Sequence, residues 1–129
     1  MSESPLLKWI FVSCQNHKIP SILAQGLAFN SQGVLFAADF GDCSIYYFPN
    51  DIKTKFAGSN DPCPDNNPDN IATAIYKDGH KDSTLIKPFA IAFDSNDNLF
   101  FTDKTSVRMI DALTGMITKI TGIFDSKKL

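Results

Sequence analysis

The hydrophobic residues of this chain fall in short runs that are separated by clusters of Asp, Asn, Ser and Gly. Ile, Phe and Thr are frequent, whereas the helix-favouring residues Glu, Arg and Gln are scarce. Short apolar runs of this composition, bounded by turn-forming residues, are typical of β-strands. The run at 117–121 also alternates apolar and polar positions, as expected where one side of a strand meets water. The pattern therefore predicts an all-β protein.

The expected strands form two sets of four, in the same order along the chain. The first set covers residues 27–29, 34–38, 45–48 and 53–57. The second set covers residues 90–93, 99–102, 107–110 and 116–121. Four short strands joined by tight turns, repeated once, indicate two antiparallel β-propeller blades.

The two sets are copies of one another at a single offset of 64 residues, at which Phe29 aligns with Phe93, Leu35 with Leu99, and Asp39 with Asp103. A fixed period of this kind identifies repeat architectures. We expect the copies to superpose as four-stranded blades, with the Phe pair and the Leu pair each in equivalent interior positions.

The repeat also defines the domain organisation that we expect. It comprises an N-terminal segment at 1–24, a first repeat at 25–58, a polar inter-blade linker at 59–88, a second repeat at 89–122 and a tail at 123–129. Residues 7–13 favour the outer strand of an adjacent blade, because Trp, Ile, Phe and Val suit a pleated surface; a short helix is the competing interpretation.

The second copy resembles the NHL repeat, a β-propeller family. Pro88 precedes an inner strand ending in Asp94, an Asn-Asp-Asn turn follows, and the next strand ends at Asp103 before an Arg-containing strand and a final strand that closes at Gly122. The first copy lacks the proline and has Ile-Tyr-Tyr-Phe in place of the Arg-containing strand. The resemblance implies two NHL-type blades of an incomplete propeller, a fold that commonly recognises proteins or other ligands through its loop faces.

In an up-and-down blade, the linker and the loops after Asp39 and Asp103 emerge on one face, which is our candidate binding surface. The candidate ligand-binding residues on it are Asp39, Asp42, Asp78, His80, Asp103 and Lys104. For Asp39 and Asp103 we favour capping of the following loop over a pair of catalytic acids, because both copies repeat the position. We predict no catalytic residue and no cofactor.

Metal ligands are also not expected. Residues 94–98 open like a calcium-binding loop, but Leu99 and Thr105 replace the Gly and Glu that an EF-hand requires, so a hairpin turn is favoured. His17 and His80 have no second His or Cys at ligand spacing. The odd number of cysteines, three, favours free thiols in a reducing compartment, and we therefore expect a cytoplasmic protein.

Charge and hydropathy narrow the class of partner. The net charge is −2 with dispersed Lys and Arg, which argues against nucleic acid. No apolar run approaches the ~20 residues that cross a bilayer, which argues against a membrane. A protein partner or a small ligand at the loop face is left as the expectation.

Three functions follow as hypotheses. The leading one is a binding scaffold, because no nucleophile with its base is visible in the sequence. The alternatives are part of a propeller enzyme, such as a lactonase-like hydrolase or an amidating lyase, and a truncated product without independent function. Two blades also leave terminal faces without partners, so we expect self-association into a ring, for instance of three chains, or into open aggregates.

Overall fold

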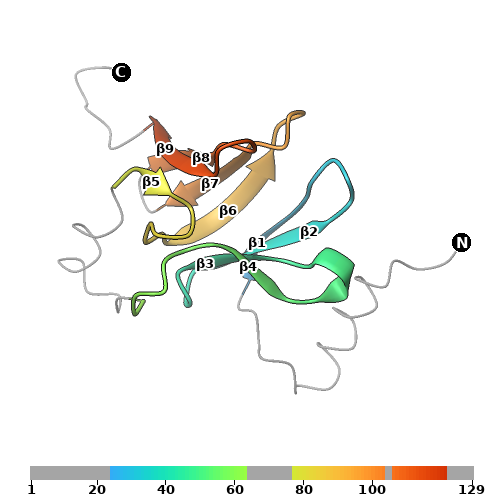
Figure 1. The fold of residues 1–129 in the computed structure, drawn as a ribbon, viewed down its shortest axis with the longest axis horizontal. Coiled ribbons are helices and arrows are strands. Elements are labelled where there is room, and N and C mark those ends of the chain that lie inside the picture. The colour runs from blue at the N-terminus through green and yellow to red at the C-terminus, as the bar shows by residue number, and fades with distance from the viewer. Residues whose placement is uncertain (1–23, 64–76, 104–105, 122–129) are drawn as a thin grey trace, which may run out of the picture.

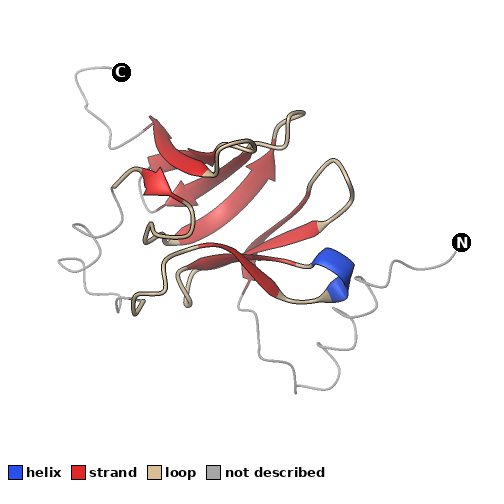
Figure 2. Ribbon diagram, in the orientation of Figure 1, coloured by secondary structure: helices blue, strands red, loops and turns tan. Residues whose placement is uncertain are grey.

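The computed structural model describes residues 24–63, 77–103 and 106–121, which form two antiparallel β-sheets (Figures 1 and 2). The first sheet has four strands in the order β1-β2-β3-β4. These are β1 (Ala24–Phe29), β2 (Leu35–Asp39), β3 (Ser44–Tyr47) and β4 (Thr54–Ala57). A short 3-10 helix, η1 (Pro49–Asp51), connects β3 to β4. The order follows the chain, as hairpin connections require.

The second sheet has five strands in the order β5-β9-β8-β7-β6. Its strands are β5 (Gly79–His80), β6 (Pro88–Phe93), β7 (Leu99–Asp103), β8 (Ser106–Ile110) and β9 (Met116–Thr121). The predicted all-β class is therefore confirmed, and the two sheets have the architecture of incomplete propeller blades. No helix among the described residues is long and apolar enough to cross a membrane.

The fifth strand is a difference from the sequence-based expectation. β5 comes from the segment that we expected to be a polar linker, and it pairs Gly79 with Ile117 and His80 with Met116. The same segment also places Ile86 in the core, fully buried. Neither Gly79 nor His80 has strand-forming propensity, so this pairing depends on the exposed edge of β9 rather than on local sequence.

Matching hairpin turns join the first two strands of each sheet. The Asn30 side chain accepts backbone hydrogen bonds from Gln32 and Val34, and the Asp94 carboxylate accepts them from Asn96 and Asn98. These are Asx-type turns, in which a side-chain oxygen replaces a backbone acceptor. The hairpin interpretation of the segment at 94–98 is thus confirmed.

The two copies share their register, but not their burial. Phe29 pairs with Leu35 in the first sheet, as Phe93 pairs with Leu99 in the second. Leu35 and Leu99 are buried as predicted, whereas the interior position predicted for Phe29 is wrong, because its side chain is 49% exposed. Phe29 lies on the face that is turned away from the second sheet, and Phe93 lies on the face that meets the first.

The core lies between the two sheets. Its buried members come from both sheets and from the segment that leads into β6, and they are Phe36, Ile45, Ala57, Ile86, Leu99, Phe101, Ile110 and Ile117. Phe93 packs edge-on against Phe36, with ring centroids 4.7 Å apart. β1 and β6 approach closely, since a Cβ atom at Gly26 would lie 2.5 Å from the Phe89 carbonyl oxygen. A glycine is therefore required where the inner strands meet.

A second contact joins the sheets at their hairpin turns. The Ser31 backbone N–H and hydroxyl both donate to the Asp97 carboxylate, at 2.8 and 2.5 Å. In Figure 1 the β1–β2 and β6–β7 turns lie at one end of the molecule, opposite the β2–β3 loop. The packed core and this polar bridge together hold the two sheets side by side.

A disulfide joins Cys43, at the end of the β2–β3 loop, to Cys63, beyond the end of β4. The expectation of free thiols is therefore wrong for these two cysteines. β3 pairs with β4, and this pairing brings the two Cα atoms to 5.5 Å, well within the range that a disulfide spans. Cys14 lies outside the described residues, as do His17, Lys104 and the strand expected at 7–13.

Candidate ligand-binding face

Asp39 ends β2 and is buried, with 5% of its surface exposed. Its Oδ1 atom accepts a hydrogen bond of 3.0 Å from the Asp42 backbone N–H. Burial raises the pKa of the Asp39 carboxyl, and the Asp42 N–H partly offsets the rise. Asp39 therefore caps the β2–β3 loop, which is the role that the sequence favoured.

Asp103 ends β7 and is fully buried beside Arg108 of β8. Arg108 Nη1 lies 3.2 Å from Asp103 Oδ2, and both side chains are at most 1% exposed. Burial raises the pKa of Asp103, and the Arg108 guanidinium opposes that rise. Because a buried charge needs a partner, the pair is a structural feature beneath the surface.

Arg108 also connects Asp103 to Asp78. Its Nη2 atom donates to the Lys77 carbonyl oxygen and lies 3.6 Å from Asp78 Oδ1. Asp78 Oδ1 in turn accepts a hydrogen bond of 3.1 Å from the Lys119 backbone N–H, while its side chain is 56% exposed. The structure thus brings Asp78 and Asp103 together through one arginine, with Asp78 at the surface.

Lys87 lies between the two sheets at the loop end and is only 3% exposed. Its Nζ atom donates to the Phe40 carbonyl oxygen at 3.3 Å and lies 4.4 Å from the centroid of the Phe40 ring. Phe40 also contacts Phe89 edge-on, at 5.4 Å between centroids, and Phe89 is 50% exposed. The β2–β3 loop is therefore fixed against the start of β6 by a cation–π contact and an aromatic pair.

Asp42 is the exposed acid of the same loop. Its carboxylate accepts a hydrogen bond from the Tyr46 hydroxyl, and burial together with this bond raises the pKa of Tyr46 to about 12. The tyrosine consequently stays protonated and keeps donating at neutral pH. Asp42 is thus held in place, two residues from Phe40, with its charge at the surface.

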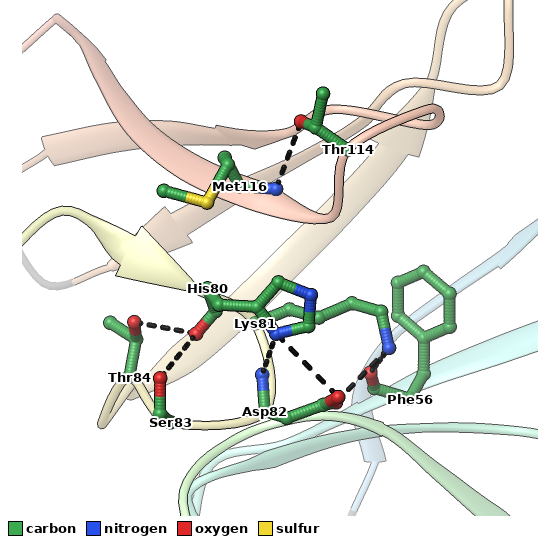
Figure 3. A network of polar contacts seen from close by, with 8 residues as sticks. All are labelled: Phe56, His80, Lys81, Asp82, Ser83, Thr84, Thr114 and Met116. Atoms are coloured by element: carbon green, nitrogen blue, oxygen red, sulfur yellow. Dashed lines mark hydrogen bonds and ion pairs between the residues drawn. The ribbon is translucent and has the colours of Figure 1, made fainter.

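His80 belongs to a separate network on the linker (Figure 3). Its Nδ1 atom accepts a hydrogen bond of 3.2 Å from the Asp82 N–H, and its carbonyl oxygen accepts one of 2.7 Å from the Thr84 hydroxyl. The neighbouring Lys81 donates to the Phe56 carbonyl oxygen at 2.9 Å. The Lys81 contact holds the linker against the first sheet. The contacts of His80 stabilise the conformation of its own loop.

Sequence reasoning missed three residues of this end of the molecule, Lys87, Phe89 and Arg108. Lys and Arg are rarely buried, so their charge pointed to the surface. The position of Arg108 in its strand was the available signal, because a strand residue two positions from the apolar Ile110 shares its face. Across the described ranges, no group of three or more His, Cys, Asp or Glu residues could hold a metal ion.

No protein-family model matches the chain, and no curated protein matches it significantly. A solved structure with a similar fold is a structural genomics protein of unknown function from Bacteroides thetaiotaomicron VPI-5482, at 20% identity and a TM-score of 0.60. The match covers 77% of this chain and 24% of that chain, so this chain spans about a quarter of its length. The likeness shows that this arrangement of sheets occurs in a known structure.

Proposed function

We propose that this chain is an NHL-type propeller segment that acts as a binding scaffold, with repeats at 25–58 and 89–122 joined by the linker at 59–88. The equal registers of the two sheets and the buried aspartates that end β2 and β7 at the same position support this organisation. The scaffold presents the loops at the ends of β2 and β7 to a protein partner.

One observation carries the proposed function: an exposed acid and an exposed aromatic ring flank Phe40 on a rigid support. Asp42 is anchored by Tyr46, and Phe89 packs on Phe40 while half of its surface faces water. The buried Asp103 is balanced by Arg108, whereas Asp42 and Asp78 keep exposed carboxylates. Carboxylates beside aromatic faces suit a cationic side chain, as Lys87 on the Phe40 ring already illustrates. The partner is therefore a protein segment that carries Arg or Lys.

The experiment measures binding of a fluorescent arginine-containing peptide, and of its glutamate-substituted counterpart, by anisotropy. We expect binding of the arginine peptide only, with an affinity that falls as salt screens the charges. Asp42→Asn keeps an acceptor for Tyr46 but removes the charge, and Phe89→Ser removes the ring. Each should weaken binding by about tenfold, the scale of an interface residue worth ~1.4 kcal/mol.

Asp82→Asn is the matched control, because Asp82 is an exposed acid of the separate His80 network. It should leave the affinity unchanged. Equal binding of the arginine and glutamate peptides, or equal losses in Asp82→Asn and Asp42→Asn, would show that the loop face does not select cationic segments.

A further inference from the structure

The free face of the second sheet repeats the face that the first sheet buries. β2 pairs Phe36 with Tyr47 and Ala38 with Ile45, and β7 pairs Phe100 with Met109 and Thr102 with Val107 in the same register. In the first sheet Phe36, Ala38 and Ile45 are at most 3% exposed, because the second sheet covers them. The corresponding residues of the second sheet are only half-buried.

This free face contains a hollow. It is shallow and apolar, and Ala92, Phe100 and Val107 are among the residues that line it. At the equivalent place on the first sheet, the Phe93 ring packs edge-on against Phe36 with centroids 4.7 Å apart. The hollow over Phe100 is thus the counterpart of the surface over Phe36 that Phe93 occupies.

The residue equivalent to Phe93 is itself free on the same chain. Phe29 takes the position of Phe93 in the register and is 49% exposed, and Leu27 beside it is 56% exposed. Leu35 and Ala37 on the same face of β2 are already buried, so the large apolar side chains that the strands of the first sheet expose belong to β1. The chain makes this aromatic contact once, between Phe93 and Phe36. It also leaves the equivalents of both partners at least partly exposed, Phe29 on the first sheet and Phe100 on the second.

We propose that copies of this chain bind head to tail, with Phe29 of one copy in the hollow over Phe100 and Val107 of the next. The contact repeats the Phe93–Phe36 packing between the two sheets of one chain. Because the two halves lie on different faces, the interface is heterologous, so successive copies form a ring or an open chain. The contact leaves the loop face free, and it is independent of the proposed binding of cationic segments.

Sedimentation velocity over a concentration series tests the proposal on the whole 129-residue chain, whose monomer mass is 14.2 kDa. We expect species larger than the monomer. Phe29→Ser and Val107→Lys should each weaken association by about tenfold or more, since removal of a central apolar contact or burial of a charge disrupts an interface. Leu113→Ser is the control, because Leu113 is 96% exposed on the β8–β9 turn and should associate like the natural chain.

The decisive measurement is made on a mixture of the Phe29→Ser and Val107→Lys variants. The Phe29→Ser chain retains its hollow and the Val107→Lys chain retains its Phe29, so one productive contact remains between them. An equimolar mixture should form a dimer and no larger species, while each variant alone stays monomeric. Circular dichroism and thermal melting establish that both variants are folded.

Three results would overturn the proposal. A natural chain that stays monomeric at the highest concentration would mean that another partner covers the free face. Association unchanged in both variants would place the contact elsewhere. Folded variants that are monomeric alone and also fail to dimerise when mixed would show that Phe29 and the hollow do not bind each other.

Discussion

The four aspartates of the candidate ligand-binding face differ in exposure, although all four were candidate ligand-binding residues in the sequence. Asp39 and Asp103 end the second strand of each repeat, but both are buried and already bonded, one to its loop and the other to Arg108. Asp42 and Asp78 keep their carboxylates at the surface. Under the proposed function, the second pair of acids is the one that can contact a ligand, while the first pair shapes the support beneath them.

The lowered pKa of Asp111 predicts how the stability of the fold changes with pH. Its Oδ1 atom accepts 2.9 Å hydrogen bonds from the Leu113 and Thr114 N–H groups, and the Thr114 bond is the main reason that its pKa lies below the usual 3.8. A lowered folded-state pKa stabilises the fold above pH 3.8 and loses that effect as the pH falls through the folded value.

Asp111→Ala should consequently lower the free energy of unfolding at neutral pH, and the difference from the natural chain should shrink below pH 3.8. Urea unfolding at several pH values measures both quantities. Leu113→Ala changes the same turn without the carboxylate and should show no such convergence. A difference that stays constant with pH would rule out the carboxylate as its cause.

Most strands could be predicted from the sequence, because each combines apolar β-forming residues with turn residues at both ends. The prediction failed where an element depends on a distant neighbour. β5 needs the edge of β9, the exposure of Phe29 depends on which face the second sheet covers, and the disulfide needs the pairing of β3 with β4. At the candidate site, the end-of-strand aspartates were predictable, whereas Lys87 and Arg108 are buried through tertiary pairing.

The packing of β1 against β6 can be tested at Gly26. A Cβ atom there would lie 2.5 Å from the Phe89 carbonyl oxygen, which is backbone and cannot turn aside. Gly26→Ala should therefore lower the free energy of unfolding by about 1–3 kcal/mol, the usual cost of overpacking. Gly41→Ala is the matched control, because a Cβ atom there would lie 3.6 Å from its nearest neighbour, Asp39 Oδ1, which is an ordinary contact. Equal effects of the two substitutions on urea unfolding would contradict the close approach of the strands.

The two sheets are held together by the core between them and by the Ser31–Asp97 hydrogen bonds, which join the β1–β2 turn to the β6–β7 turn. The linker adds a third connection, since Gly58 donates its backbone N–H to the Lys81 carbonyl oxygen at 2.8 Å and Lys81 donates to that of Gly115 at the same distance. The β2–β3 loop is fixed from both sides, by Lys87 and by the disulfide at Cys43. The proposed binding loop is thus held by a side-chain contact and by a covalent bond.

The disulfide should contribute to this constraint measurably. It closes a loop across a sequence separation of 20 residues, and cross-links of this length typically stabilise a fold by about 2–4 kcal/mol by restricting the unfolded chain. Cys63→Ser should lower the free energy of unfolding by that amount, and reductant should destabilise the natural chain but not the variant. Alkylation in denaturant, followed by mass spectrometry, should label Cys43 and Cys63 only after reduction. Labelling of both without reductant in the oxidised, purified protein would show that the bond is not formed and that noncovalent contacts alone hold the loop.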